Sequence, residues 1–181
     1  MAIPRSLAPL LLLVTVSVIP AFVLGSRVPA SESLTKACNA TVERETCENV
    51  LKSNPESATA SPRRLAELAF QYLVKDGPVL VAESNLELAA AKDENTRNCL
   101  GSYDDQLTSY VVSVAAIGAP DQGEAKFIEA RDKLRDLLRW RSNGAYSCPG
   151  HPIVFKIAKY ERMLQITLDL MNAASPPPKA A

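Results

Sequence analysis

The sequence predicts an all-α protein: an up-and-down four-helix bundle preceded by a short, disulfide-clipped N-terminal helical hairpin. Apolar residues recur at steps of three and four along four long segments, which is the pattern of packed helices. The chain of 181 residues has only seven glycines and few β-branched alternations, which disfavours a sheet. Four cysteines form an even set behind an apolar leader. The expected divisions are a signal peptide (1–25), an extension and hairpin (26–60), the bundle (61–174) and a flexible tail (175–181).

The leader has the features of a cleavable export signal. Arg5 supplies the positive start, the apolar run Leu7–Ile19 follows, and Pro20 ends it before small residues near Gly25. A retained membrane anchor is the alternative, because this stretch is almost long enough to span a bilayer. The small residues and the absence of a basic stop-transfer cluster favour cleavage. We therefore expect a secreted, extracellular protein with no membrane association after cleavage.

Charge composition excludes one class of partner. The chain has 20 Lys and Arg residues and 20 Asp and Glu residues, so it lacks the basic excess that a nucleic-acid binder needs to displace phosphate counterions. Asn39 begins the sequon Asn39-Ala40-Thr41 and is a candidate glycosylation site in the secretory pathway. We expect no nucleic-acid partner.

The N-terminal elements follow from capping and breaking residues. A polar lead-in over 26–36, expected to be mobile, precedes helical residues from Cys38 to Leu51, and Asn54-Pro55 breaks the chain there. Ser61 as N-cap, with Pro62 at the first helical position, starts the first bundle helix. The apolar positions of this helix are Leu65, Leu68, Tyr72 and Leu73.

Three further helices complete the expected bundle. Gly77-Pro78 predicts a kink or brief break in the first, with helix resuming over 81–91. Asn95 is the expected N-cap of the second, and Gly118-Ala119-Pro120 ends it. The third runs from near Asp121 to Asn143-Gly144, and the fourth begins at Pro152. The apolar positions of the second helix are Leu100, Tyr103, Leu107, Tyr110, Val114 and Ile117. Those of the third are Phe127, Ala130, Leu134 and Leu137. Those of the fourth are Ile153, Ile157, Tyr160, Leu164, Thr167 and Met171.

Four cysteines allow three pairings, and the sequence alone does not select one. The expected topology favours Cys38–Cys47, which would clip the hairpin, and Cys99–Cys148, which lie near the same end of the bundle. On the chain-entropy model, the two bridges stabilise the fold by about 2.5 and about 4 kcal/mol. Zinc is the rival interpretation, and the absence of a C-x2-C pair disfavours it. We expect no metal.

The chain offers no recognisable catalytic apparatus. It contains no nucleophile elbow, P-loop or dinucleotide fingerprint, and its single histidine, His151, lies in a turn between Gly150 and Pro152. The adjacent acids Asp93-Glu94 and Asp104-Asp105 are interpreted as solvated faces or a helix-end cluster, because neighbours on a helix point about 100° apart. Acids paired from distant positions, as in a glycosidase, stay an open alternative. We expect no enzyme activity and no cofactor.

Trp140 is the most informative aromatic residue. It lies among alternating basic and acidic residues over 129–141, which we interpret as a solvated helix face rather than a nucleic-acid or membrane patch. The indole either caps the bundle core, which we favour, or serves as an exposed anchor for a partner, since Trp is enriched at interface hot spots.

Several of these features occur together in one family. Cys38-x8-Cys47 followed by Leu51, the segment Asn-Pro-Glu-Ser-Ala at 54–58, and Cys99-Leu-Gly-Ser-Tyr103 resemble the plant invertase/pectin methylesterase inhibitor family over residues 36–174. The resemblance implies a secreted inhibitor in the apoplast that occludes the active-site cleft of pectin methylesterase or, as an alternative, of acid invertase. In invertase-type members a Pro-Lys-Phe triplet enters the target's active site. Its nearest counterpart is Ala125-Lys126-Phe127, which makes Lys126 and Phe127 candidate partner contacts.

Two other classes of function stay open beside the inhibitor. One is a secreted structural or ligand protein with no enzyme target. The other is a carrier of small apolar ligands, which the bulky residues on the helix seams disfavour because they leave little room for a cavity. Those residues are Tyr103, Tyr110, Phe127 and Tyr160.

Overall fold

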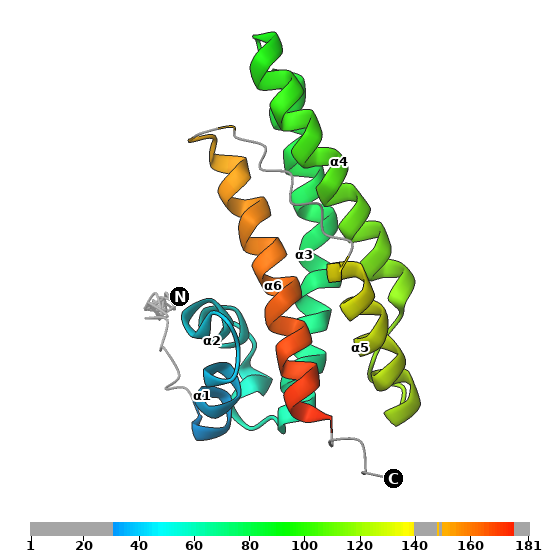
Figure 1. The fold of residues 1–181 in the computed structure, drawn as a ribbon. Coiled ribbons are helices and arrows are strands. Elements are labelled where there is room, and N and C mark those ends of the chain that lie inside the picture. Colours follow the sequence, from blue (N-terminus) through cyan, green and yellow to red (C-terminus); the bar gives the residue numbers. More distant parts are fainter. Residues whose placement is uncertain (1–30, 140–147, 149, 176–181) are drawn as a thin grey trace, which may run out of the picture.

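The computed structural model describes residues 31–139, 148 and 150–175, and this part of the chain is all-helical, with no strand (Figure 1). The predicted fold class is confirmed. The predicted signal peptide, Trp140, the expected end of the third bundle helix and most of the predicted tail lie outside the described residues. The elements are α1 (Glu32–Asn39), α2 (Arg44–Leu51), the short 3-10 helix η1 (Pro55–Ala58), α3 (Pro62–Ala90), α4 (Glu94–Ile117), α5 (Glu124–Arg139) and α6 (Pro152–Ala174).

Helices α3 to α6 alternate in direction, and α3 packs along both α4 and α6 (Figure 1). The apolar positions predicted from periodicity line the core: those of α6 are all buried, and in α4 and α5 only Tyr103, Ile117 and Leu137 are partly exposed. Helix α5 has 16 residues against 29 in α3 and lies beside the lower half of the bundle only. No helix in the described ranges is both long and apolar enough to cross a membrane.

Helix α3 continues through Gly77-Pro78. Of the two predicted outcomes, a kink or a brief break, the break is therefore wrong. Pro78 is exposed, and the amide that proline lacks is therefore missing on the solvent side, where water can satisfy the freed carbonyl. Gly77 is buried and allows a close contact. A Cβ atom there would lie 2.8 Å from both the Tyr160 hydroxyl and a Val111 methyl. The Tyr160 hydroxyl donates to the Leu73 carbonyl at 3.2 Å.

The start of α3 is as predicted, whereas the N-cap of α4 and the start of α1 differ from the prediction. Ser61 caps α3, as predicted, by accepting from the Arg64 amide at 3.2 Å. Asp93, not Asn95, caps α4, because its carboxylate accepts from the Thr96 amide at 2.8 Å. Ser31 caps α1, which begins at Glu32. The lead-in expected to be mobile up to residue 36 is therefore helical in its second half.

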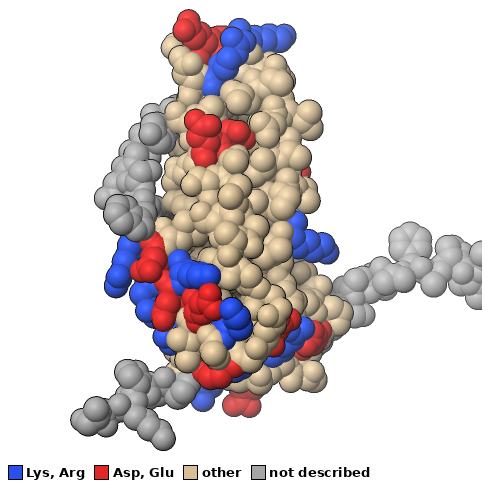
Figure 2. Space-filling view, turned by 90° about the vertical axis from the view of Figure 1, so that its right-hand side faces the viewer, with Lys and Arg blue, Asp and Glu red and all other residues tan. Residues whose placement is uncertain are grey.

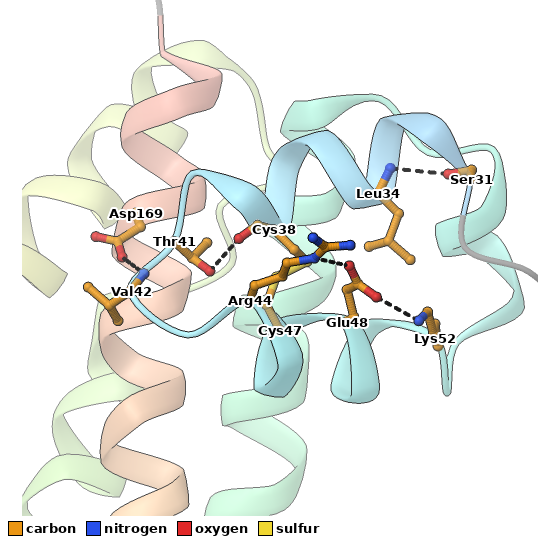
Figure 3. The surroundings of a disulfide bond; sticks show 10 residues. All are labelled: Ser31, Leu34, Cys38, Thr41, Val42, Arg44, Cys47, Glu48, Lys52 and Asp169. Atoms are coloured by element: carbon orange, nitrogen blue, oxygen red, sulfur yellow. Dashed lines mark hydrogen bonds and ion pairs between the residues drawn. A yellow bond between two sulfur atoms is a disulfide. The ribbon is translucent and has the colours of Figure 1, made fainter.

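The N-terminal hairpin packs on the sides of α3 and α6 at the lower half of the bundle (Figure 1). The Cys38–Cys47 disulfide joins α1 to α2 (Figure 3), and both cysteines are fully buried. The Val42 amide between these helices donates to the Asp169 carboxylate of α6 at 3.1 Å. Apolar contacts and this polar contact thus attach the hairpin to the bundle.

The second disulfide joins Cys99, near the start of α4, to Cys148, which precedes α6. Its Cα atoms are 5.8 Å apart. Both disulfides of the structure are the pairs that the expected topology favours.

Candidate docking surface

The described residues contain no cluster of three or more His, Cys, Asp and Glu side chains that would hold a metal ion. His151 immediately precedes α6, and its Nε2 atom lies 3.9 Å from a carboxylate oxygen of Glu87. That separation is too long for a direct hydrogen bond. The acids Asp93 and Glu94 lie at the start of α4, where Asp93 serves as the cap.

Asp104 differs from its predicted place on a solvated face. It is 9% exposed, and its Oδ1 atom has no hydrogen-bond partner among the described residues. The reason is register: Asp104 follows Leu100 by four residues and precedes Leu107 by three, so it lies on the buried side of α4. Its neighbour Asp105 is exposed, as predicted.

The most distinctive surface is an uncharged stretch of α4. From Gln106 to Pro120 the chain has no Asp, Glu, Lys or Arg, although six residues of this segment are exposed to solvent. Figure 2 shows this side of the molecule, where uncharged surface lies between charges at the upper end of the bundle and dense charges in its lower part. We call the exposed residues of this stretch the α4 face: Ser109, Val112, Ala115, Ala116, Gly118 and Ala119.

An apolar groove borders the α4 face. It has a volume of about 240 Å³ and lies between the lower part of α3 and the end of α4. Phe70 and Val74 line one side, and Val114, Ala115 and Ala119 line the other. Val112 on the α4 face is 63% exposed. Protein interfaces are depleted of charge at their centre, so this surface has the composition of a docking site.

Lys126 and Phe127, the predicted partner contacts, differ in exposure. Lys126 is exposed in the first turn of α5, and its Nζ atom lies 2.8 Å from the Glu129 carboxylate. Phe127 is 1% exposed, with the Arg63 guanidinium 4.7 Å from its ring centroid. Its ring is part of the core and cannot contact a partner in this conformation, so the expectation for Phe127 is corrected. The resemblance used the sequence triplet alone, whereas the helical register of α5 turns Phe127 inward.

The pKa of Glu129 reports on the ion pairs of α5 in which Lys126 takes part. Hydrogen bonds from Lys126 and Lys133, each at 2.8 Å, lower the pKa of Glu129 from its ordinary value of 4.5 to about 2. A lowered pKa in the folded state adds stability that is complete above pH 4.5 and is lost as the pH falls towards 2. For ion pairs as exposed as these, this added stability is small.

Lys126→Ala is therefore expected to raise the pKa of Glu129, because it removes the largest of the causes that lower it. The measurement is an NMR titration of the Glu129 side-chain carboxyl in both proteins. Lys133→Ala is the matched control and is expected to shift the pKa in the same direction. An unchanged titration in both variants would show that these ion pairs do not form in solution.

The remaining predicted site residue in the described part of the chain is Asn39, the candidate glycosylation site. Asn39 is exposed at the end of α1, and the Thr41 hydroxyl donates to the Cys38 carbonyl at 2.8 Å. An exposed Asn39 is accessible for glycan attachment on the folded domain. Trp140 lies outside the described residues.

The fold and these surfaces define an all-α bundle that is cross-linked by two disulfides and bears an uncharged exposed surface on α4. No protein-family model matches the chain, and comparisons with curated proteins and with solved structures give no match either.

Proposed function

We propose that the chain is a secreted protein inhibitor of a plant cell-wall carbohydrate-active enzyme, with pectin methylesterase as the first target. It acts by docking over the active-site cleft of the enzyme rather than by chemistry of its own. The two disulfides support an extracellular place of action, because disulfides persist in oxidising compartments. The resemblance to the inhibitor family supplies the class of target.

The uncharged α4 face is the observation that carries the proposal. Occlusion needs a surface of about 800 Å² per partner, and charged side chains at its centre would have to be desolvated. The α4 face offers apolar and small polar groups without charge. In the bordering groove, charge is limited to Lys75 and Asp121, and the other lining residues are uncharged. Its position on a bundle that is cross-linked at Cys99–Cys148 reduces the entropy lost when a partner binds.

The test is a titration of pectin methylesterase activity with the purified secreted protein and with Val112→Asp. We expect stoichiometric inhibition by the wild type and at least about a tenfold higher inhibition constant for the variant, because a charge would enter the centre of the interface. Phe155→Asp is the matched control, since Phe155 is equally exposed on α6, away from the α4 face. Equal inhibition by wild type and Val112→Asp would reject the α4 face as the docking site.

Acid invertase is the second candidate target, and the exposure of Lys126 favours it. Lys126→Ala is expected to weaken invertase inhibition and to leave the melting temperature unchanged, because exposed ion pairs contribute little to stability. A fall in melting temperature would assign Lys126 a structural role instead. If the protein inhibits neither enzyme, the alternative of a secreted bundle without an enzyme target is favoured.

A further inference from the structure

The two disulfides differ in how accessible they are from solvent. Cys38 and Cys47 are each 0% exposed and lie between α1 and α2 (Figure 3). Cys99 and Cys148 are both partly exposed. Thiol–disulfide exchange requires a thiolate to reach one of the two bonded sulfur atoms, so access decides which bridge reacts in the folded protein. Of the two bridges, Cys99–Cys148 is the one that meets this requirement.

A pocket of about 360 Å³ leads to the accessible bridge, and both Cys99 and Cys148 line it. This volume is within the range of sites that hold small molecules. The other described residues on its walls come from the start of α4 and from the start of α6, and none of them is Asp or Glu. An incoming thiolate therefore meets no carboxylate on the described walls of the pocket.

A turn holds His151 close to Cys148. The His151 amide donates to the Cys148 carbonyl at 3.3 Å, and Gly150 between them has a φ of 84°, which favours glycine. The imidazole lines the same pocket as the bridge. Its Nε2 atom lies 3.9 Å from Glu87, whereas its enclosed Nδ1 atom has no hydrogen-bond partner among the described residues. A neighbouring imidazole favours the thiolate form of a cysteine.

The Cys99–Cys148 bridge ties two helices together where the bundle is thinnest. Helix α5 lies beside the lower half of the bundle only (Figure 1), so in the described part of the chain α3, α4 and α6 alone form the upper half. The bridge joins the second turn of α4 to the residues that enter α6. Opening it removes this tie, while the α1–α2 hairpin keeps its own bridge.

We propose that Cys99–Cys148 is a thiol-exchange site, at which a dithiol reductant opens the bridge in the folded protein while Cys38–Cys47 stays closed. One thiolate of the reductant attacks Sγ of Cys99, the bridge breaks, and Cys148 leaves as a thiolate that His151 stabilises. The second thiolate of the reductant then attacks the reductant's own sulfur in this mixed disulfide and releases Cys99. Two electrons pass to the bridge, the reductant ends as a disulfide, and its two protons end on Cys99 and Cys148.

The first experiment exposes the oxidised protein, without denaturant, to about 1 mM dithiothreitol at about pH 8, where a thiol is partly ionised. N-ethylmaleimide blocks the released thiols at successive times, and peptide mass spectrometry locates them. We expect Cys99 and Cys148 to be labelled together, with an initial rate at least about tenfold above that of Cys38 and Cys47. Equal rates for the two bridges, or no labelling of either until urea is added, would overturn the proposal.

The second experiment tests His151 with two substitutions that differ in charge. His151 precedes α6 without a side-chain capping hydrogen bond, so both variants are expected to keep the melting temperature of the oxidised protein. His151→Gln is expected to slow the opening of the bridge severalfold, whereas His151→Lys is expected to retain the rate, because a cation also stabilises the leaving thiolate. An unchanged rate in His151→Gln, or equal slowing in both variants, would overturn the role of His151.

Reversibility distinguishes a redox switch from damage. After selective opening, Cys99 and Cys148 are the two thiols available for pairing, because Cys38 and Cys47 stay bonded to each other. Removal of dithiothreitol and addition of oxidised glutathione is expected to re-form Cys99–Cys148 and to restore the melting temperature. Failure of the bridge to re-form would show that opening is not reversible and would overturn the switch.

Discussion

Reduction of the Cys99–Cys148 disulfide is expected to lower the free energy of unfolding by about 4 kcal/mol, because this bridge closes a long loop in the unfolded chain. The two cysteines are 49 residues apart. The closed loop contains most of α4 and all of α5, so its cross-link restricts a large part of the bundle when the chain unfolds. Reduction of Cys38–Cys47, with a separation of 9 residues, is expected to cost only about 2.5 kcal/mol.

Substituting the cysteines would not isolate these two values. Cys38 and Cys47 are fully buried, so replacing them also removes packed atoms from the core. The measurement is therefore urea unfolding of two double variants, each with and without reductant. The double variant Cys38→Ala/Cys47→Ala retains only Cys99–Cys148, so the effect of reductant on it measures the contribution of the long loop. The double variant Cys99→Ala/Cys148→Ala retains only Cys38–Cys47 and measures the contribution of the short loop. A larger loss on reducing the short loop would contradict the prediction.

Gly77→Ala is expected to destabilise the protein by about 2 kcal/mol, although alanine is the better helix former by about 1 kcal/mol. The added methyl would lie 2.8 Å from both the Tyr160 hydroxyl of α6 and a Val111 methyl of α4, so α3 would have to move away from both helices. Gly101 of α4 is the matched control, because nothing lies within 4 Å of a Cβ atom there. Gly101→Ala is expected to stabilise by up to about 1 kcal/mol.

Thermal or urea unfolding of the two glycine variants gives the comparison directly. The free energy of unfolding is expected to fall in Gly77→Ala and to rise in Gly101→Ala, although the chemical change is the same. If both variants gain stability, the close approach of Tyr160 to α3 does not exist in solution. Tyr160→Phe in the Gly77→Ala background is expected to recover part of the loss, because it removes one of the two clashing groups.

The bundle helices could be predicted from the sequence because each presents an apolar stripe at helical spacing. Leu107, Leu134 and Ile157, one from each of the last three, are all fully buried. The start of α3 was predicted equally well, since Ser61-Pro62 combines two local signals for a helix N-terminus. Local patterns of this kind are sufficient where packing and propensity agree.

The differences arise where tertiary packing overrides a local signal. Gly77-Pro78 reads as a break, but burial of Gly77 against Tyr160 keeps α3 continuous. Helix α1 has too few residues to be stable alone, and its disulfide and its packing on α3 hold it in the fold. Neither contact is visible in a short sequence window.

The candidate site also contains features that the sequence predicts and features that depend on tertiary packing. The pairing of the cysteines followed from topology, whereas the inward direction of Phe127 depends on where α5 begins. The α4 face contains no charged residue and no catalytic motif, so no sequence motif marks it as a site. The sequence signal for this face is the uncharged stretch from Gln106 to Pro120, and which of its residues are exposed depends on how α4 packs in the bundle.

Hydrogen exchange of the protein with and without pectin methylesterase tests the central claim, docking through the α4 face, most directly. We expect slower exchange of the backbone amides from Gln106 to Pro120 in the complex and no change in the α1–α2 hairpin. Protection confined to other helices, or no protection at saturating enzyme, would contradict the account.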